Sequence, residues 1–435
     1  MSELDLPRID GVIADLKTKL LEDYAPPQIK RDAHPKLHGC VQAELIIGEV
    51  DERFRHGLFK HPGTYRTWVR FSNAFGIQHD LKADTRGLAL KVLDPPGGES
   101  DFLDAEDGEH SSQDFLMATH DAFFLPRPED YKEFAPAVKK GSIAVARYFL
   151  SRPSRWRGGL ALYMSARVLA RNPLAIPYFS QTPYQLGPHV VKLQATPTLT
   201  PELTRSLPPA GAYKTKALIV GMALSVSRLR VIKLIARLLG KDPSPANVTA
   251  FCDRVAFRDS LRHALMSFLS SHEAEFHLKV HCFVNEEITP IEDATRRWKN
   301  TASEIIPVAT LRIPRQVFWP MPGMPTEVAQ ATSRMMDLGE NMSFTPWHGL
   351  KVHEPLGAIN LARKRIYLQI ARFRRLQNGV EASEVLAQQG PKSYDALRAI
   401  VQGISVPATS SRFDSALSAY PAGTGFGSVP ETQNP

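Results

Sequence analysis

The stretch Arg363-Lys364-Arg365-Ile366-Tyr367 is the part of this chain that says most about its fold and its chemistry. Apolar residues continue beyond it at Ile370 and Phe373, a spacing that predicts one face of an amphipathic helix. Arg363 precedes Tyr367 by one helical turn, so the two side chains share that face. A neighbouring positive charge favours the ionised phenol. A phenolate on an apolar face is a poor core residue but a good hard ligand for ferric iron.

Composition and charge narrow the possible partners. The chain has 435 residues, 43% hydrophobic side chains and a net charge of +8, enough to bury one large core or two ordinary ones. The positive excess lies at residues 139–241 and 363–375 and lacks the aromatic interleaving of a nucleic-acid surface. It suits carboxylate-bearing ligands instead. We therefore expect no nucleic-acid partner.

Cysteine usage and the N-terminus indicate the compartment. The cysteines Cys40, Cys252 and Cys282 are odd in number and lack metal-ligand spacing. No basic-then-apolar signal begins the chain, and the longest apolar run, residues 217–227, is too short to span a bilayer. These features predict a cytoplasmic protein.

The order of predicted elements defines the fold class. Strand patterns precede a helix-rich middle, and strands return at residues 190–195, 276–284 and 307–313. The last third is helical, at residues 325–338 and 356–376. Without a regular βαβ rhythm, this order favours an α+β fold, an antiparallel barrel surrounded by helices. We expect a helical arm at 1–27, a main domain at 28–403 with a basic helical insertion at about 205–250, and a disordered tail at 404–435.

Four motifs upstream of the Arg363–Tyr367 pair occur in a fixed order. They are His38-Gly39, Val69-Arg70-Phe71-Ser72, Asp84-Thr85-Arg86-Gly87-Leu88-Ala89-Leu90-Lys91-Val92, and the run from Thr119 to Phe124. Together with Arg363-Lys364-Arg365-Ile366-Tyr367, this series resembles the haem catalase superfamily over about residues 28–136 and 270–376. The chain is similar to its compact, catalase-related branch, which includes allene oxide synthases. The resemblance implies haem b, buried between the barrel and the C-terminal helix.

The resemblance also implies roles for individual residues. His38 would be the distal acid–base, and Ser72 would orient it by hydrogen bonding. Tyr367 would be the proximal ligand of the ferric iron, and Arg363 would keep its phenol anionic. Arg70 and Arg374 would pair with the haem propionates. Tyr131 would lie against the haem plane or, equally, on a helix surface.

Two departures from the family pattern bear on the reaction. Where the family has a distal Asn, this chain has Ala118 and Thr119, so Thr119 would supply a single hydroxyl in a less polar pocket. Pro35 stands where the family has an arginine three residues before the distal His, and Lys36 would take over that propionate contact.

The altered distal side favours an enzyme that acts on organic or fatty-acid hydroperoxides, as a peroxidase or an isomerase. A slow true catalase acting on H2O2 remains an alternative, as does a non-catalytic haem- or lipid-binding protein. The oligomeric state stays open.

A basic segment at residues 214–241 falls outside the family pattern. Arginines and lysines recur there among Leu, Val and Ile. The pattern favours a surface helix packed on its own domain, and a membrane-surface contact is the alternative.

Overall fold

Alternating apolar residues build an antiparallel barrel. The computed structural model describes residues 6–96, 112–140, 142–226, 244–321 and 323–403. The strands in these ranges are β1 (Lys36–Ile47), β2 (Gly63–Asn73), β3 (Arg86–Leu93), β4 (Ser112–Ala118), β5 (Tyr178–Phe179), β6 (Tyr184–Leu186), β7 (His189–Pro197), β8 (Ala274–Cys282) and β9 (Ile305–Ile313). They follow the order β5-β4-β3-β2-β1-β9-β8-β7-β6, and an additional pairing of β5 with β7 closes the ring. The predicted barrel is confirmed.

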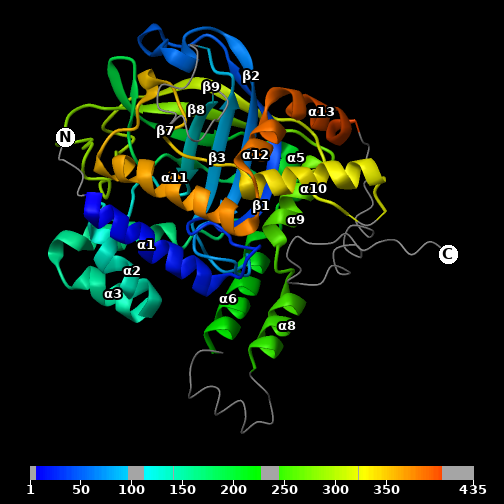
Figure 1. Cartoon of the computed structure of the whole chain (residues 1–435), viewed down its shortest axis with the longest axis horizontal. Helices are drawn as coiled ribbons and strands as arrows, with labels where there is room; N and C mark the ends of the chain where they lie inside the picture. The colour runs from blue at the N-terminus through cyan, green and yellow to red at the C-terminus, as the bar shows by residue number, and fades with distance from the viewer. Residues whose placement is uncertain (1–5, 97–111, 141, 227–243, 322, 404–435) are drawn as a thin grey trace.

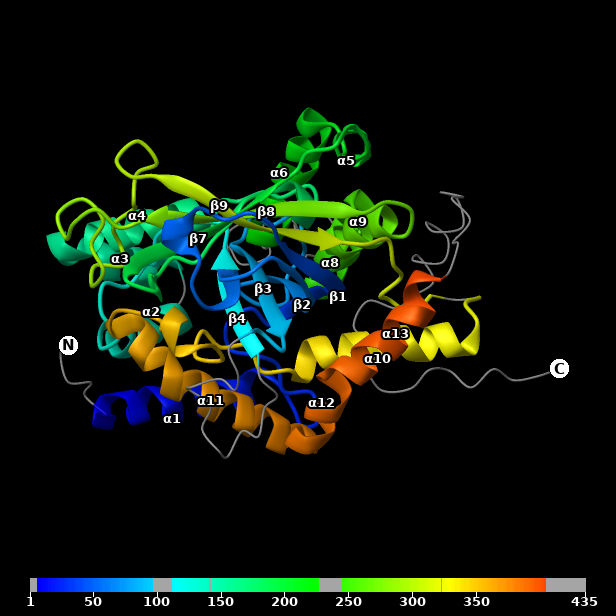
Figure 2. The same ribbon diagram turned by 90° about the horizontal axis from the view of Figure 1, so that it is seen from above.

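Helices surround this barrel (Figures 1 and 2). In chain order, the described α-helices are α1 (Leu6–Asp23), α2 (Asp130–Lys140), α3 (Ser142–Leu150), α4 (Trp156–Ser165), α5 (Pro201–Ser206), α6 (Ala210–Val226), α8 (Pro245–Val255), α9 (Ser260–Leu269), α10 (Thr326–Asn341), α11 (Ala358–Asn378), α12 (Ala382–Gln389) and α13 (Pro391–Gln402). Short 3-10 turns lie at Glu52–Phe54, Gly57–Phe59, Pro153–Arg155, Pro173–Ala175 and Lys351–His353. None of the described helices is long and apolar enough to cross a membrane.

Both faces of β2 are buried, which explains its apolar and aromatic content. Val69 and Phe71 lie in the barrel core, as period-two alternation predicts. Trp68, on the opposite face, is also fully buried, and its indole Nε1 donates to the carbonyl of Gln389 at 2.9 Å. The C-terminal helices α12 and α13 therefore cover this side of the barrel (Figure 1).

Helix α10 lies unusually close to β1. A Cβ at Gly339 would stand 2.6 Å from the Cβ of Cys40, so only glycine permits this approach. The side chain of Leu37 lies against the same glycine, and the pairing of β1 with β2 shifts between Leu37 and Gly39. This β-bulge brings Leu37 and Cys40, three residues apart, onto one face of β1.

Helices α1 and α11 lie side by side beneath the barrel (Figures 1 and 2). Ile9, Val12 and Leu16 pack with Ile370 of α11 in a common apolar cluster. At the surface, Asp10 accepts two hydrogen bonds from Arg365 at 2.7 and 2.9 Å. The N-terminal helix thus covers the helix that carries Tyr367.

The segment expected as an insertion, about 205–250, contains α6 and the first part of α8. Helices α6 and α8 pack on each other and project from the barrel (Figure 1). Residues 227–241 of the predicted basic segment lie outside the described residues, as does the tail at 404–435.

Candidate functional site

His34 is the histidine that Ser72 contacts. It sits in the turn before β1 with a φ of 61°, in the left-handed region, and its side chain is only partly buried. Its ring Nδ1 lies 3.1 Å from the hydroxyl Oγ of Ser72. With the proton on Nδ1, the ring donates to Ser72 and keeps the Nε2 lone pair available as a base.

The register of the barrel strands brings the other distal candidates beside this pair. Ser72 of β2 lies opposite Gly87 of β3, and Gly87 lies opposite Ala118 of β4. A Cβ at Gly87 would stand 2.4 Å from Nδ1 of His34, so the imidazole rests on the backbone of β3. Thr119 follows Ala118, and its Oγ1 accepts a hydrogen bond from the amide of Arg86 at 3.1 Å.

His38 has different surroundings from those predicted. Its Nε2 lies 2.6 Å from Oδ1 of Asn73, and its Nδ1 is buried without a hydrogen-bond partner. The side chain is 1% exposed. The expected contact of Ser72 with His38 is therefore wrong, because the turn before β1 places His34, four residues earlier, over Ser72.

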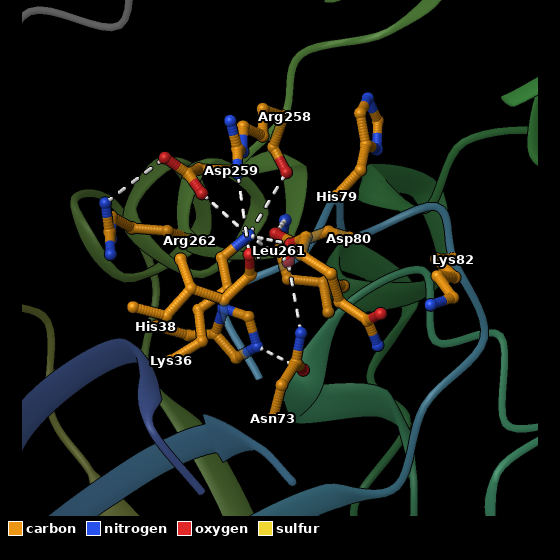
Figure 3. A network of polar contacts seen from close by, with 12 residues as sticks. Lys36, His38, Asn73, His79, Asp80, Lys82, Arg258, Asp259, Leu261 and Arg262 are labelled. Carbon is orange, nitrogen blue, oxygen red and sulfur yellow. Dashed lines mark hydrogen bonds and ion pairs between the residues drawn. The ribbon is translucent and has the colours of Figure 1, made fainter. Parts of the chain in front are cut away.

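Lys36 belongs to the same buried network as His38 (Figure 3). Its Nζ lies 2.6 Å from Asp80 and 2.7 Å from Asp259, and it also donates to the carbonyl of Gln78 at 2.7 Å. An ammonium group has three donors, and these contacts occupy them. Lys36 thus pairs with two carboxylates of its own chain. This differs from the expected contact with a haem propionate.

Asp80 is the centre of this network. Besides Lys36, it accepts from Asn73 Nδ2 at 3.3 Å and from the amide of Leu261, at the start of α9, at 2.9 Å. Asn73 also accepts a short hydrogen bond from Arg86. The network therefore ties β1 and β2 to α9, a structural role that accounts for its polar residues.

Burial and charge keep both histidines neutral. Burial, with the charges of Arg70, Arg363 and Arg31, lowers the pKa of His34 to about 3. Burial also lowers the pKa of His38 to about 4, although Asp80 opposes that shift. Arg363 lies on α11, one turn before Tyr367, and its charge is among those that lower the pKa of His34. The helix that carries Tyr367 and the turn that carries His34 are therefore near each other.

Three guanidinium groups meet between that turn and α11, those of Arg70 and Arg374 buried and that of Arg31 partly buried. Arg31 and Arg70 each donate to the carbonyl of Gly339 at 2.9 Å, and Arg70 also donates to the carbonyl of His34 at 3.0 Å. Arg374 of α11 donates to the carbonyl of Asn341 at 3.3 Å, while its Nε is buried without a partner.

The carboxylate of Glu340 lies near these arginines, 3.3 Å from Lys30 Nζ and 3.9 Å from Arg31 Nη1. Burial opposes its ionisation, but Lys30, Arg70, Arg31 and Arg374 together lower its pKa. Burial lowers the pKa of Arg374 to about 9, with the other cations opposing its charge. A buried surplus of positive charge is costly unless anions compensate it. The positive charge of this cluster exceeds the negative charge beside it, so the two carboxylates of a haem would balance it.

Helix α11 presents the predicted proximal residues together. The guanidinium of Arg363 lies 5.9 Å from the ring centre of Tyr367 and 5.3 Å from that of Phe123. Its Nη1 donates to Thr182 and Asn360, each at 3.2 Å. Tyr367 itself is half-buried. A phenol oxygen is an established ligand for haem iron, so this donor fits such a cofactor.

Tyr131 of α2 lies at the edge of this arrangement. Like Ile366 and Phe373 of α11, it packs against the apolar cluster between α1 and α11, and its hydroxyl donates to Asp32 at 3.4 Å. Burial, with the charge of Asp32, raises the pKa of Tyr131 well above its usual value. Tyr131 is thus neither a free surface residue nor a charged one.

Sequence reasoning missed Arg31 and His34, although a signal was present. The family pattern has an arginine three residues before the distal histidine. Counting back from His38 reaches Pro35, whereas counting back from His34 reaches Arg31, which lies in the arginine cluster. The family's spacing of arginine and histidine therefore fits the pair Arg31 and His34 as the sequence stands.

A closed antiparallel barrel with this helix across its base defines a catalase-like fold. A fungal catalase matches with a TM-score of 0.55 and 14% sequence identity, over 85% of this chain and 63% of the catalase. Catalase A from Saccharomyces cerevisiae matches with a TM-score of 0.52 and 13% identity, over 97% of this chain and 75% of the catalase. At these identities the likeness establishes the fold.

Comparison at the level of sequence finds no counterpart. No protein-family model matches the chain, and no curated protein does so. The chain also spans less than two thirds of the fungal catalase.

Proposed function

We propose that this protein is a haem-dependent oxidoreductase that consumes peroxides, with organic or fatty-acid hydroperoxides favoured over H2O2. One observation carries the proposal. Arg31 and Arg70 both donate to the carbonyl of Gly339 and Arg374 donates to that of Asn341, so three guanidinium groups gather on either side of Glu340, between the His34 turn and the Tyr367 helix. Such a surplus of buried guanidinium groups matches the two propionates of a haem.

On the proximal side, Tyr367 is the iron ligand and Arg363 supplies the positive charge beside its phenol. Arg31, Arg70 and Arg374 bind the propionates, so Arg31 takes the place that the sequence assigned to Lys36. Tyr131 packs beside the same helix and closes that edge of the site.

On the distal side, His34 takes the role first assigned to His38. When bound, the haem supplies the redox chemistry that cleaves the peroxide O–O bond. The neutral imidazole of His34 accepts the peroxide proton at Nε2 and returns it to the departing oxygen. Ser72 holds the ring by accepting from Nδ1, which keeps Nε2 unprotonated and correctly oriented.

The substrate preference depends on Thr119. Its Oγ1 accepts a hydrogen bond from the amide of Arg86, so one lone pair and the hydroxyl proton remain for a ligand. A small symmetric peroxide needs polar groups on both sides, whereas an alkyl hydroperoxide gains binding energy from apolar contacts.

Cofactor identity is tested spectroscopically. Protein produced with haem should show a high-spin ferric Soret band with phenolate-ligand features. Tyr367→Phe should remove those features, and Tyr131→Phe, which leaves Tyr367 in place, should keep them. Protein that takes up no haem, or a Tyr367→Phe variant with an unchanged spectrum, would refute the assignment.

Substrate class is tested by mixing haem-loaded protein with H2O2 or with a fatty-acid hydroperoxide and following spectrum and products. We expect faster reaction with the lipid peroxide. Thr119→Asn should raise oxygen evolution from H2O2. Oxygen evolution by the unaltered protein at rates usual for catalases would instead favour the true catalase.

A further inference from the structure

Two consecutive helices, α3 and α4, lie side by side at one side of the barrel (Figure 2), and each carries a stripe of exposed apolar side chains. On α3, Ile143 and Leu150 lie two turns apart and are 78% and 72% exposed. On α4, the exposed residues follow helical spacing and are Trp156, Leu160, Tyr163 and Met164. Isolated exposed apolar residues are ordinary, but a stripe of large ones on adjoining helices marks an interaction surface.

The opposite faces of both helices are buried in one aromatic cluster. Tyr148 and Phe149 of α3 pack there with Phe134 of α2. Gly158 of α4 rests on the backbone of Phe124, where a Cβ would stand 2.2 Å from the carbonyl oxygen. Both helices are thus held firmly on the fold, and their apolar stripes point away from it.

Positive charge surrounds the apolar stripes. Residues 134–201 include no aspartate or glutamate. Arg147, Arg152, Arg157 and Arg167 are all exposed. No described residue forms an ion pair with Arg152 or Arg157, whereas Arg155 turns inward to Glu133.

A cavity of about 330 Å³ lies beside the start of α4. Arg127, Arg152, Ser154 and Arg157 line it together with Asp130 and Asp293. Asp130 is already held by Arg127 at 3.5 Å and by Arg155 at 3.9 Å. Arg152 and Arg157 therefore remain available to an anionic group such as a lipid phosphate.

From these observations, we propose that α3 and α4 dock this protein on the surface of an anionic phospholipid bilayer. Trp156, Leu160, Tyr163 and Met164 enter the headgroup–acyl boundary, and Arg152 and Arg157 bind lipid phosphates. The exposed arginines on and beside α3 and α4 outnumber the carboxylates next to them, so this face repels a second copy of itself, which argues against a symmetric dimer here. The proposal relocates the membrane contact from residues 214–241 to residues 142–165 and does not depend on the haem.

Binding is measured by flotation of the full-length protein with vesicles of phosphatidylcholine alone or mixed with phosphatidylglycerol. We expect binding to the mixed vesicles only, weakened by salt. Trp156 gives a second signal, because the other four tryptophans, Trp68, Trp298, Trp319 and Trp347, are buried or half-buried. Its emission should shift to the blue on binding, and Trp156→Phe should remove that shift.

The variant Trp156→Glu/Leu160→Glu should lose binding by more than about tenfold, and Arg152→Gln/Arg157→Gln by about tenfold. The matched control is Leu218→Glu/Met222→Glu on α6, whose target residues are also exposed; it should bind as the unaltered protein does. Loss of binding in that control alone would overturn the proposal in favour of residues 214–241. Absence of vesicle binding by the unaltered protein would overturn the proposal too. So would a Trp156→Glu/Leu160→Glu variant that binds vesicles normally but dissociates an oligomer formed without lipid.

Discussion

Two histidines four residues apart meet opposite environments in this fold. His34 lies in a turn, partly open, with one hydroxyl as its partner and only arginines close enough to shift its pKa. His38 lies in β1, closed on all sides, with Asn73 and Asp80 around it. Chemistry needs the first kind of environment, because a base must be reachable and must have a free lone pair. The second kind holds the molecule together.

The strongest test of this difference uses the same substitution at both positions. Asparagine tolerates the left-handed backbone of residue 34 and lacks an imidazole. We expect His34→Asn to slow the reaction of haem-loaded protein with peroxide by about 10²- to 10⁴-fold, the usual worth of general acid–base catalysis. His38→Asn should change the rate by less than about tenfold. Stopped-flow absorbance measures both rates, and the reverse order would restore His38 as the distal residue.

The buried network around His38, which should matter little for the rate, should matter most for stability. Asp80→Asn leaves the buried ammonium of Lys36 with Asp259 alone, and we expect a loss of about 3 kcal/mol in the free energy of unfolding. The control is Asp395→Asn. Both carboxylate oxygens of Asp395 lie 2.7 Å from the guanidinium of Arg66, and this ion pair is exposed. That change should cost less than about 1 kcal/mol. Urea denaturation measures both, and equal losses would contradict the structural role of the network.

The pH dependence of stability isolates His38. Its pKa is about 4 in the folded protein, against about 6.5 for an unperturbed histidine. Between these values the unfolded chain binds more protons, so the free energy of unfolding falls as the pH falls. By pH 4, His38 should have lowered the free energy of unfolding by about 3 kcal/mol, at 1.36 kcal/mol per pKa unit.

His38→Asn should therefore lose less stability than the unaltered protein between pH 6.5 and pH 4. Denaturation curves across this range measure the difference. Parallel pH profiles for the two proteins would show that His38 is not held neutral by the network.

The smallest expected effect concerns the partner hydroxyl. Ser72→Ala should slow the peroxide reaction by about 10- to 100-fold while haem content stays the same, because the ring of His34 loses its orienting contact. Ser72→Thr, which keeps a hydroxyl, should recover most of the rate. Failure of the threonine variant to recover any rate would indicate that Ser72 acts through packing and not through its hydrogen bond.

Much of the fold follows from local patterns along the chain. Alternation at Tyr65 to Phe71 predicted β2, and the helical spacing around Tyr367 predicted α11, because each pattern is repeated over several residues. The short strands β5 and β6 and the helices α12 and α13 were not assigned. The segments β5, β6 and α12 are short, and their positions depend on the barrel they close or cover. In α13 the helical spacing of Tyr394, Leu397 and Val401 was a signal that the sequence did offer.

The sequence by itself determined which chemical groups this protein has available: a helix-borne phenol beside an arginine, a serine on β2, and two histidines near the start of β1. Only the tertiary structure showed which of those histidines contacts the serine. Residue spacing along a chain does not say how a turn and a β-bulge rotate side chains, and here they turn His34 toward Ser72 and His38 toward Asn73. The same folding brings Arg31, Arg70 and Arg374 together near Glu340. Because they are distant in sequence, their concentrated positive charge exists only in the folded chain.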